Sequence, residues 1–375
     1  MRNRMKFLDL FAGIGGFRLG LESAGHECVG FCEIDKFARK SYKAIHNTEG
    51  EVELHDITTV TDDTIRGIGH VDIICGGFPC QAFSIAGKRR GFEDTRGTLF
   101  FEIARFASVL KPKYLFLENV KGLLSHDKGN TFEVILETLD ELGYDAEWQV
   151  FNSKNFGVPQ NRERVFIIGH LRGAGGREIF PFRGKSSSIE NEQIKKLGNI
   201  NPSGSGMNGS VYSLEGLAPT ITTNKGEGIK IFGVLQPNFN QSGCVYEVDS
   251  IAPTLRTMQG GNLEPKIAIK EATKKGYAEA EVGDSVNLSH PGSKTRRGRV
   301  GKGIANTLLA RESQGVVGSD FRIRKLTPRE CWRLQGFPDW AFDKAQEVNS
   351  NSQLYKQAGN SVTVNVIAAI AKELD

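Results

Sequence analysis

The first 171 residues alternate short apolar runs with segments of helical periodicity, and this alternation constrains the fold more than any other feature. A short apolar run between turn signals indicates a buried strand, whereas apolar residues repeating every three or four positions indicate an amphipathic helix. Strands alternating with helices predict an α/β fold with a doubly wound, mostly parallel sheet. The predicted strands span 7–11, 28–33, 71–77, 114–120, 148–152 and 164–171, and the predicted helices span 17–25, 36–46, 98–111 and 130–143.

The end of this region departs from the parallel pattern. Only a short loop containing Gly and Pro separates the strands predicted at 148–152 and 164–171. A parallel pair needs a crossover of a dozen or more residues, so we expect an antiparallel pair at one edge of the sheet. The segment 361–374 has the apolar density of a buried helix. The chain is therefore expected to return to the α/β core at its end.

The middle of the chain differs from the first 171 residues in periodicity and glycine content. From about residue 172 to 323 helical periods give way to short, glycine-rich segments, which predict a smaller, irregular, β-rich domain. Residues 209–228 and 243–262 match at eight of twenty positions, which indicates either a repeated turn scaffold or loops presented to a polymeric ligand. The expected domains are 1–183, completed by 345–375, then 184–323, with a hinge and return segment over 324–344.

Composition excludes several classes of protein. The 39% hydrophobic residues and a net charge of 48 − 44 = +4 fit a folded globule and not a disordered chain. No apolar run approaches the roughly 20 residues of a membrane span. Six Cys without a CxxC pair predict neither a disulfide framework nor a metal site. We therefore expect a cytoplasmic, thiol-reduced protein that contacts no membrane.

The first motif lies at a predicted strand-to-helix turn, Asp9-Leu10-Phe11-Ala12-Gly13-Ile14-Gly15-Gly16-Phe17. Glycines at such a turn let the backbone approach a ligand. Glu33 ends the next strand, where an acid reaches ribose hydroxyls, and Asp56 follows the next strand candidate. Arg18 replaces the third Gly of the dinucleotide pattern GxGxxG. Taken alone the motif also fits an ordinary tight turn; with its acids it favours a nucleoside cofactor that lacks a pyrophosphate.

The second motif, Gly76-Gly77-Phe78-Pro79-Cys80-Gln81, stands at the carboxyl end of an apolar strand. A lone Cys is usually an inert core residue, but ligands bind at this edge of a parallel sheet. The polar, basic stretch 82–97 follows, either as a mobile flap or as a plain solvated loop. Nearby cations would depress the thiol pKa and activate Cys80 as a nucleophile.

Two further motifs carry charge at strand boundaries. Glu118-Asn119-Val120 ends an apolar strand, and a carboxylate there is costly to bury without a partner. Gln160-Asn161-Arg162-Glu163-Arg164 precedes another strand, so that Gln160, Arg162 and Arg164 are expected on one face. Taken separately, these motifs fit a salt-bridged acid and a surface charge run equally well.

In that order the segments DLFAGIGGF, GGFPCQ, LENV and QNRER resemble the C5-cytosine DNA methyltransferases of bacterial restriction–modification systems. The blocks RKLTPRECWRLQGFPD (324–339) and YKQAGNSVTVNV (355–366) agree with this resemblance. It covers about residues 5–170 and 322–370, and most of 172–321 falls outside it. The resemblance implies an S-adenosylmethionine-dependent methyltransferase fold and a middle domain that recognises DNA.

The resemblance also assigns residue roles. It implies that Cys80 adds to C6 of a flipped cytosine, that Glu118 protonates or hydrogen-bonds N3, and that Arg162 and Arg164 contact the base carbonyl, Glu118 or a flanking phosphate. The implied contacts with S-adenosylmethionine are Phe11, Ala12, Gly13, Ile14, Gly15, Gly16, Glu33, Ile34, Asp56, Ile57, Pro79, Leu99, Asn360, Ser361 and Val362. The implied DNA contacts are Gln81, Ser84, Lys88, Arg89, Arg90, Arg96, Arg256, Arg297, Thr307 and Leu308.

The expected partner is double-stranded DNA, because residues 294–325 carry nine basic and two acidic side chains. The resemblance implies monomeric action without an obligatory protein partner, and a cognate restriction endonuclease acting on the same site. Three alternatives stay open: the same chemistry on transfer RNA, a catalytically silent DNA-binding relative, and a nicotinamide dehydrogenase. The 150-residue middle region argues against the first of these, and Cys80 with Glu118 argues against the second. Arg18 in the glycine turn argues against the third.

Overall fold

The computed structural model describes residues 4–79, 99–181, 267–289, 293, 295–310, 313–319 and 323–374, with the backbone alone of 196–199 and 210–212. By the clustering of contacts, residues 1–184 and 268–375 form one compact unit and residues 185–267 another. In the second unit the backbone of β8 (Lys196–Asn199) pairs with β9 (Ser210–Tyr212) in antiparallel fashion. Both Ala-Pro-Thr segments of the repeat, at 218–220 and 252–254, lie outside the described residues.

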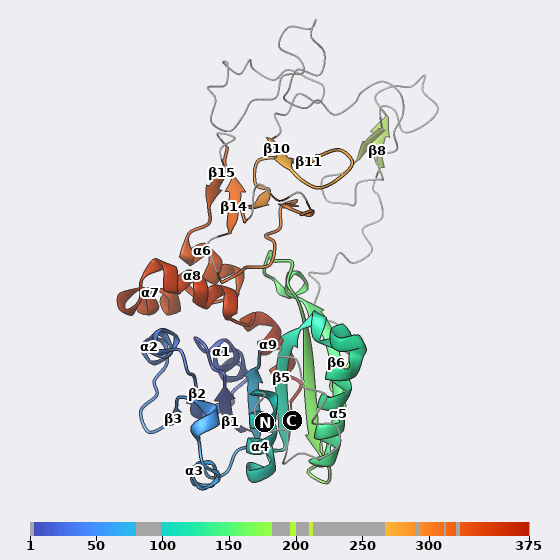
Figure 1. Ribbon diagram of the computed structural model, residues 1–375. Coiled ribbons are helices and arrows are strands. Elements are labelled where there is room, and N and C mark those ends of the chain that lie inside the picture. The colour runs from blue at the N-terminus through green and yellow to red at the C-terminus, as the bar shows by residue number, and fades with distance from the viewer. Residues whose placement is uncertain are drawn as a thin grey trace, which may run out of the picture. The chain divides into compact units, whose positions relative to one another are not determined.

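The first unit is built on a seven-stranded sheet with the order β3-β2-β1-β4-β5-β7-β6 (Figure 1). Strands β1 to β5 run parallel to one another, whereas β7 is antiparallel to both β5 and β6. This confirms the mostly parallel α/β fold and the antiparallel edge pair. The strands are β1 (Lys6–Leu10), β2 (Glu27–Cys32), β3 (Val52–Leu54), β4 (Ile73–Gly77), β5 (Tyr114–Val120), β6 (Tyr144–Asn152) and β7 (Glu163–Leu171). The short β3 has no apolar run of its own and corresponds to the strand candidate before Asp56, for which no bounds were predicted.

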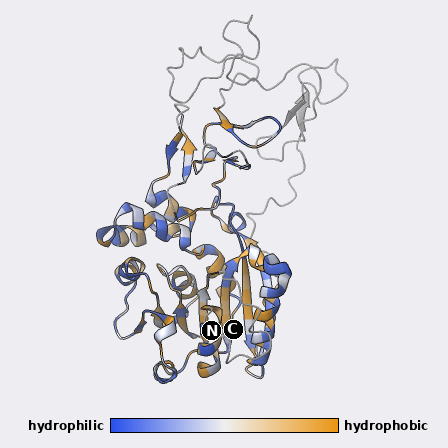
Figure 2. Cartoon of the chain, in the orientation of Figure 1, coloured by the Kyte–Doolittle hydropathy of each residue, from blue (hydrophilic) through white to orange (hydrophobic). Residues whose placement is uncertain are grey.

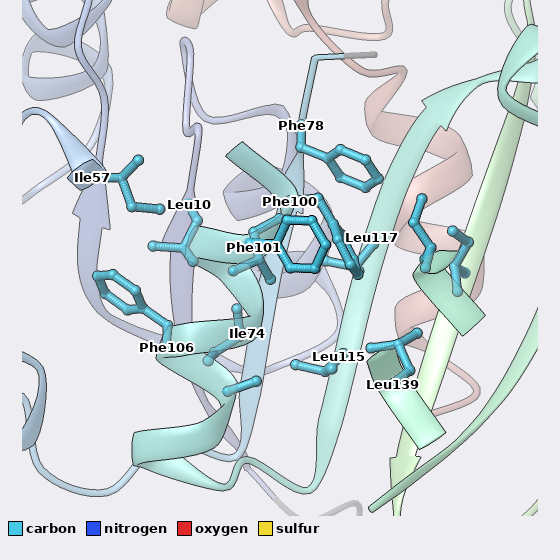
Figure 3. Close-up of a cluster of buried hydrophobic side chains, with 14 of the residues drawn as sticks. Leu10, Ile57, Ile74, Phe78, Phe100, Phe101, Phe106, Leu115, Leu117 and Leu139 are labelled. Atoms are coloured by element: carbon cyan, nitrogen blue, oxygen red, sulfur yellow. The ribbon is translucent and has the colours of Figure 1, made fainter. Parts of the chain in front are cut away.

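Helices cover both faces of this sheet. The helices between strands are α1 (Gly16–Ser23), α2 (Lys36–Ile45), α3 (Asp62–Gly67), α4 (Leu99–Leu110) and α5 (Asn130–Glu141). On one face Phe100, Phe106 and Leu139 share a buried cluster with Ile74 and Leu117 (Figure 3). Figure 2 shows that the central strands are largely hydrophobic while α5 also carries hydrophilic residues, as expected of helices that cover a buried sheet.

The other face is covered by helices from the two ends of the chain. Phe17 and Leu21 of α1 share a buried cluster with Val366, Ile367 and Ile370 of α9 (Val364–Ala371). The predicted return of the chain is therefore found, and the predicted helix over 361–374 begins at Val364. Before it lie α6 (Pro328–Leu334), α7 (Asp339–Val348) and α8 (Asn351–Asn360), which pack around the buried Trp332.

Small antiparallel sheets make up the described part of the middle region. One pairs β10 (Ile267–Lys270) with β11 (Tyr277–Ala280). The other has the order β13-β12-β14-β15. Its strands are β12 (Ser285–Asn287), β13 (Val300–Gly301), β14 (Gln314–Val317) and β15 (Ile323–Lys325). No helix in the described part of the chain is long and apolar enough to cross a bilayer.

One acid is buried inside the sheet. Asp9 of β1 is 0% exposed and accepts a hydrogen bond from Tyr42 Oη at 3.2 Å, while Cys75 Sγ lies 3.7 Å from its other oxygen. Burial disfavours the carboxylate and raises the pKa of Asp9 to about 8, despite the opposing effects of Tyr42 and Arg18. The folded protein therefore holds a proton here that the unfolded chain has lost at neutral pH.

We expect the free energy of unfolding to depend on pH through Asp9. Its contribution is fully present below the ordinary Asp pKa and is lost as pH rises through about 8, because only the folded state keeps the proton between these values. The slope from one such group is about 1.4 kcal/mol per pH unit. Urea denaturation from pH 4.5 to 8.5 should show this slope in the difference between the parent and Asp9→Asn. A pH-independent difference would mean that Asp9 is ionised in the fold.

Candidate active site

The candidate site lies where the parallel strands end. The carboxyl ends of β1, β2, β4 and β5 meet at one edge of the sheet, where α/β proteins bind their ligands. The glycine turn follows β1, Glu33 follows β2, and Pro79 follows β4. Because β7 is antiparallel, its beginning reaches this same edge, and Arg164 pairs in register with Val120 of β5.

On one side of this edge the glycine turn is tied to Glu33. The Gly13 N–H donates to Glu33 Oε2 at 2.8 Å, and the Asp35 N–H donates to Oε1 at 2.7 Å. Each carboxylate oxygen has a second lone pair, so both can still accept from a ligand hydroxyl. Burial raises the pKa of Glu33 even though these two N–H groups oppose the shift. The neighbouring Ile34 is 67% exposed, which offers an apolar platform beside this acceptor.

The returning segment of the chain closes on the same turn. A Cβ added to Gly16 would lie 2.8 Å from Val362 Cγ2 and 2.9 Å from Ser361 Oγ, so only glycine allows this close approach. Asn360 is the final residue of α8, directly before these two. The structure therefore brings together residues that lie about 340 positions apart in the sequence.

The other predicted cofactor residues surround the same edge. Asp56 accepts from the N–H and hydroxyl of Thr58 and caps the short helix η1 (Ile57–Thr59), and Ile57 itself is buried. Pro79 is exposed, and Leu99 begins α4. Phe11 has a φ of 55°, Ala12 donates to the Cys32 carbonyl at 3.0 Å, and Ile14 is buried. No described contact tests these cofactor assignments, which remain predictions.

His46 was not identified from the sequence, yet its ring packs against the glycine turn. Its Nε2 lies 3.3 Å from the Ile14 carbonyl, and a Cβ on Gly15 would collide with that nitrogen. Burial lowers the pKa of His46 to about 3, so the ring is neutral and donates from Nε2, since a carbonyl only accepts. His46 directly follows α2 and stands four positions after the buried Tyr42, and this helical spacing was the only signal in the sequence.

The other side of this edge, where catalytic residues are predicted, centres on Glu118. Its carboxylate is buried, and Arg164 Nε lies 3.0 Å from Oε1. That distance makes an ion pair, but Oε1 has no well-aligned hydrogen bond among the described residues. A Cβ on Gly77 would lie 3.1 Å from Oε2, so the glycine leaves room for the carboxylate. Burial raises the pKa of Glu118, against the lowering effect of Arg164 and Arg162.

Cys80 lies outside the described residues, but the chain that leads to it is described. Gly77 pairs with Glu118 in the sheet, three residues before Cys80. Asn119 donates from Nδ2 to the Phe78 carbonyl at 2.9 Å and so ties the strand-to-Cys80 connection to β5. Asn119 belongs to a motif that the sequence identified, but its contact across the sheet has no local signature.

Arg162 has a different environment from Arg164. Its guanidinium is buried and donates to the carbonyls of Ser361 at 2.8 Å, Gly359 at 3.3 Å and Leu308 at 3.5 Å. Burial lowers its pKa. The expectation that Gln160, Arg162 and Arg164 share one strand face is right only in part, because β7 begins at Glu163. Gln160 and Arg162 both reach Leu308, whereas Arg164 reaches Glu118.

Few of the predicted DNA contacts lie in the described chain. Thr307 donates from its hydroxyl to the Asn161 carbonyl at 2.7 Å, the Leu308 side chain is buried, and Arg297 is exposed. Parts of the basic stretch have internal partners: Arg299 donates to the Asn287 carbonyl, Lys302 pairs with Asp284, and Arg324 pairs with Glu330. The remaining predicted contacts lie outside the described residues: Gln81, Ser84, Lys88, Arg89, Arg90, Arg96 and Arg256.

Comparison with known proteins identifies relatives of the chain. The orphan methyltransferase M.SPRI of Bacillus phage SPR is 38% identical, over 99% of this chain and 97% of its own. The type II methyltransferase M.HhaI of Haemophilus parahaemolyticus is also 38% identical, over 98% of this chain and 93% of its own.

Solved structures share the fold. A prophage-encoded protein of E. coli, described as a DNA modification methyltransferase, superposes with a TM-score of 0.55 at 22% identity, covering 98% of both chains. A triple mutant of Spodoptera frugiperda DNMT2 superposes with a TM-score of 0.51 at 18% identity, covering 98% of this chain and 99% of its own. The model of C-5 cytosine-specific DNA methylases matches residues 5–375. The chain therefore belongs to the C5-cytosine DNA methyltransferase family.

Proposed function

We propose that this enzyme flips a cytosine out of duplex DNA and methylates its C5 with S-adenosylmethionine as donor. One observation carries the proposal: the buried Glu118–Arg164 pair lies at the end of β5, beside the strand that leads to Cys80. The glycine turn tied to Glu33 lies at the same edge of the sheet. A base pocket and a nucleoside pocket would therefore be adjacent.

The donor set fits the proposed cofactor. Glu33 presents carboxylate oxygens that suit ribose hydroxyls, and the exposed Ile34 suits the flat face of an adenine ring. Ser361 and Val362 would close the pocket from the opposite side of the turn. When bound there, S-adenosylmethionine supplies an electrophilic methyl group on its sulfonium. The chain's own residues would hold it with that group facing the flipped base.

The residues of the catalytic side would activate the base. Cys80 Sγ would bond to C6, which makes C5 nucleophilic, while Glu118 donates a proton or hydrogen bond to N3. Arg164 would hold the Glu118 carboxyl in place and contact the base carbonyl. After C5 accepts the methyl group, loss of the C5 proton to water or another base expels Cys80 and restores the ring.

The remaining parts of the chain would serve DNA binding. The stretch 81–97 would close over the flipped base, with Lys88, Arg89, Arg90 and Arg96 on phosphates. Residues 184–323 would read the target sequence. In cells we propose a cytoplasmic monomer that protects DNA; its relatives include both type II and orphan enzymes, so a cognate endonuclease is one of two arrangements.

The proposed function predicts methylated cytosine in DNA. Purified protein with tritium-labelled S-adenosylmethionine should label unmethylated genomic DNA and leave transfer RNA unlabelled. Bisulfite sequencing of DNA from a methylation-free host that expresses the gene should then show one short protected sequence. Labelling of transfer RNA alone would replace this proposal by the RNA enzyme, and no labelling of either would refute it.

A further inference from the structure

A segment of the middle region is bonded directly to the approach to β7. We define the docking segment as residues 305–310. Ala305 donates to the Pro159 carbonyl at 2.8 Å, and Asn161 donates to the Ala305 carbonyl at 2.9 Å. Gln160 and Ala305 thus form a parallel bridge. The docking segment also receives a hydrogen bond from Gln314 of β14, at the Thr307 carbonyl, so it is continuous with the small four-stranded sheet.

The side chain of Gln160 completes this attachment. It is fully buried, accepts from the Leu308 N–H at 3.1 Å and donates to the Leu334 carbonyl at 2.8 Å. A buried amide whose groups are all bonded is costly to disturb, because each orphaned partner would lose about 1–3 kcal/mol. Gln160 therefore fixes the docking segment against both β7 and the end of α6.

The docking segment also touches the cofactor side. Arg162 bonds the carbonyls of both Leu308 and Ser361, and so bridges the docking segment and the chain's return. A Cβ on Gly359 would collide with the Leu309 carbonyl oxygen. Hydrogen bonds thus run from Leu308 through Arg162 to the Ser361 carbonyl, and the Ser361 hydroxyl lies where a Cβ on Gly16 of the glycine turn would meet it.

We propose that Gln160 and Gly359 are positioning residues that keep the docking segment in register with the cofactor turn, so that DNA and the cofactor bind with positive coupling. This inference rests on the proposed function. DNA held by the middle region would fix the docking segment, and the fixed segment would hold Ser361 against the turn. By linkage, each ligand would then tighten the other by the same factor.

The sharpest test is Gly359→Ala, because the added methyl group must displace the Leu309 carbonyl. Gly67→Ala is the matched control: Gly67 is also helical, and its added Cβ meets nothing within 4 Å. Both changes favour their helices by about 1 kcal/mol, so intrinsic helix stability is balanced. The readout is the affinity of the full chain for S-adenosylhomocysteine, measured by calorimetry with and without sheared unmethylated genomic DNA.

We expect DNA to tighten S-adenosylhomocysteine binding at least about fivefold in the parent and in Gly67→Ala. The ratio should fall to about one in Gly359→Ala. Because the readout is a ratio, a direct effect of the methyl group on the cofactor pocket cancels. Gln160→Met removes the side-chain hydrogen bonds to Leu308 and Leu334 without adding bulk to α8, and it should lower the ratio in the same way. Gln357→Met should leave the ratio unchanged, because Gln357 is another buried amide whose hydrogen bonds lie outside the docking segment.

The outcomes separate this inference from the proposed function. A parent that methylates DNA but shows no coupling would overturn the inference and leave the function intact. So would an unchanged ratio in either folded variant. A parent that labels no DNA would overturn the function itself.

Discussion

Replacing Cys80 by Ser should lower methyl transfer to DNA by about 10⁴-fold or more while DNA binding survives. The physical reason is the nucleophile: a thiol is partly ionised near neutral pH and is intrinsically nucleophilic, whereas a hydroxyl is neither without a strong base. Single-turnover transfer of tritium-labelled methyl groups gives the rate, and gel shift gives DNA affinity. Full turnover by Cys80→Ser would remove the covalent mechanism.

Cys331 provides the matched control for this change. It is a buried cysteine of α6 that packs with Trp332 and Leu334 in the helical cluster. Cys331→Ser should keep most of the activity. A duplex carrying 5-fluorocytosine at the target position should trap the parent covalently in the presence of cofactor, because fluorine cannot leave as the C5 proton does. The trap should form with Cys331→Ser and fail with Cys80→Ser.

Replacing Glu118 by Gln should lower the rate of the chemical step by about 10²–10⁴-fold, the usual range for loss of a general acid. Burial raises the pKa of Glu118, so the protonated form that can serve N3 persists to higher pH than in an ordinary carboxyl. The parent rate should therefore fall as pH rises through that raised pKa, whereas an amide at this position cannot titrate. The pH profile of single-turnover transfer should therefore lose its descending limb in Glu118→Gln.

Glu102 offers the control for that variant. It is also a buried acid paired with an arginine, since Arg105 Nη2 lies 2.6 Å from Glu102 Oε2, but it belongs to α4 and not to β5. Glu102→Gln should keep both the rate and the pH profile. A descending limb that survives in Glu118→Gln would assign the proton to another group.

Much of the fold and part of the candidate site followed from local patterns. Apolar runs predicted six of the seven strands of the main sheet, and loop length predicted the antiparallel edge. The ion pair of Glu118 with Arg164 also follows once β7 is placed antiparallel to β5, because the end of β5 then lies beside the start of β7. The sequence could not predict that the Gln160 side chain would accept a hydrogen bond from the Leu308 N–H, since those residues are 148 positions apart.

Contacts made by buried polar groups were the least predictable. Asp9 stood in a recognised motif, yet nothing local shows that Tyr42 would supply its hydrogen bond. Asn119 reaches the Phe78 carbonyl only because β4 and β5 are neighbours. The middle region was less predictable still, because short strands without a period carry little information about which partner each will pair with.

The packing of α9 on α1 has a consequence for synthesis in the cell. One side of α1 meets α9, and a Cβ on Gly20 would lie 2.5 Å from Ile367. The ribosome makes that partner about 340 residues after α1, so for most of its translation a nascent polypeptide lacks the helix that packs on α1 beside the proposed donor pocket. Each molecule would acquire the capacity to mark DNA only once α9 has emerged and docked.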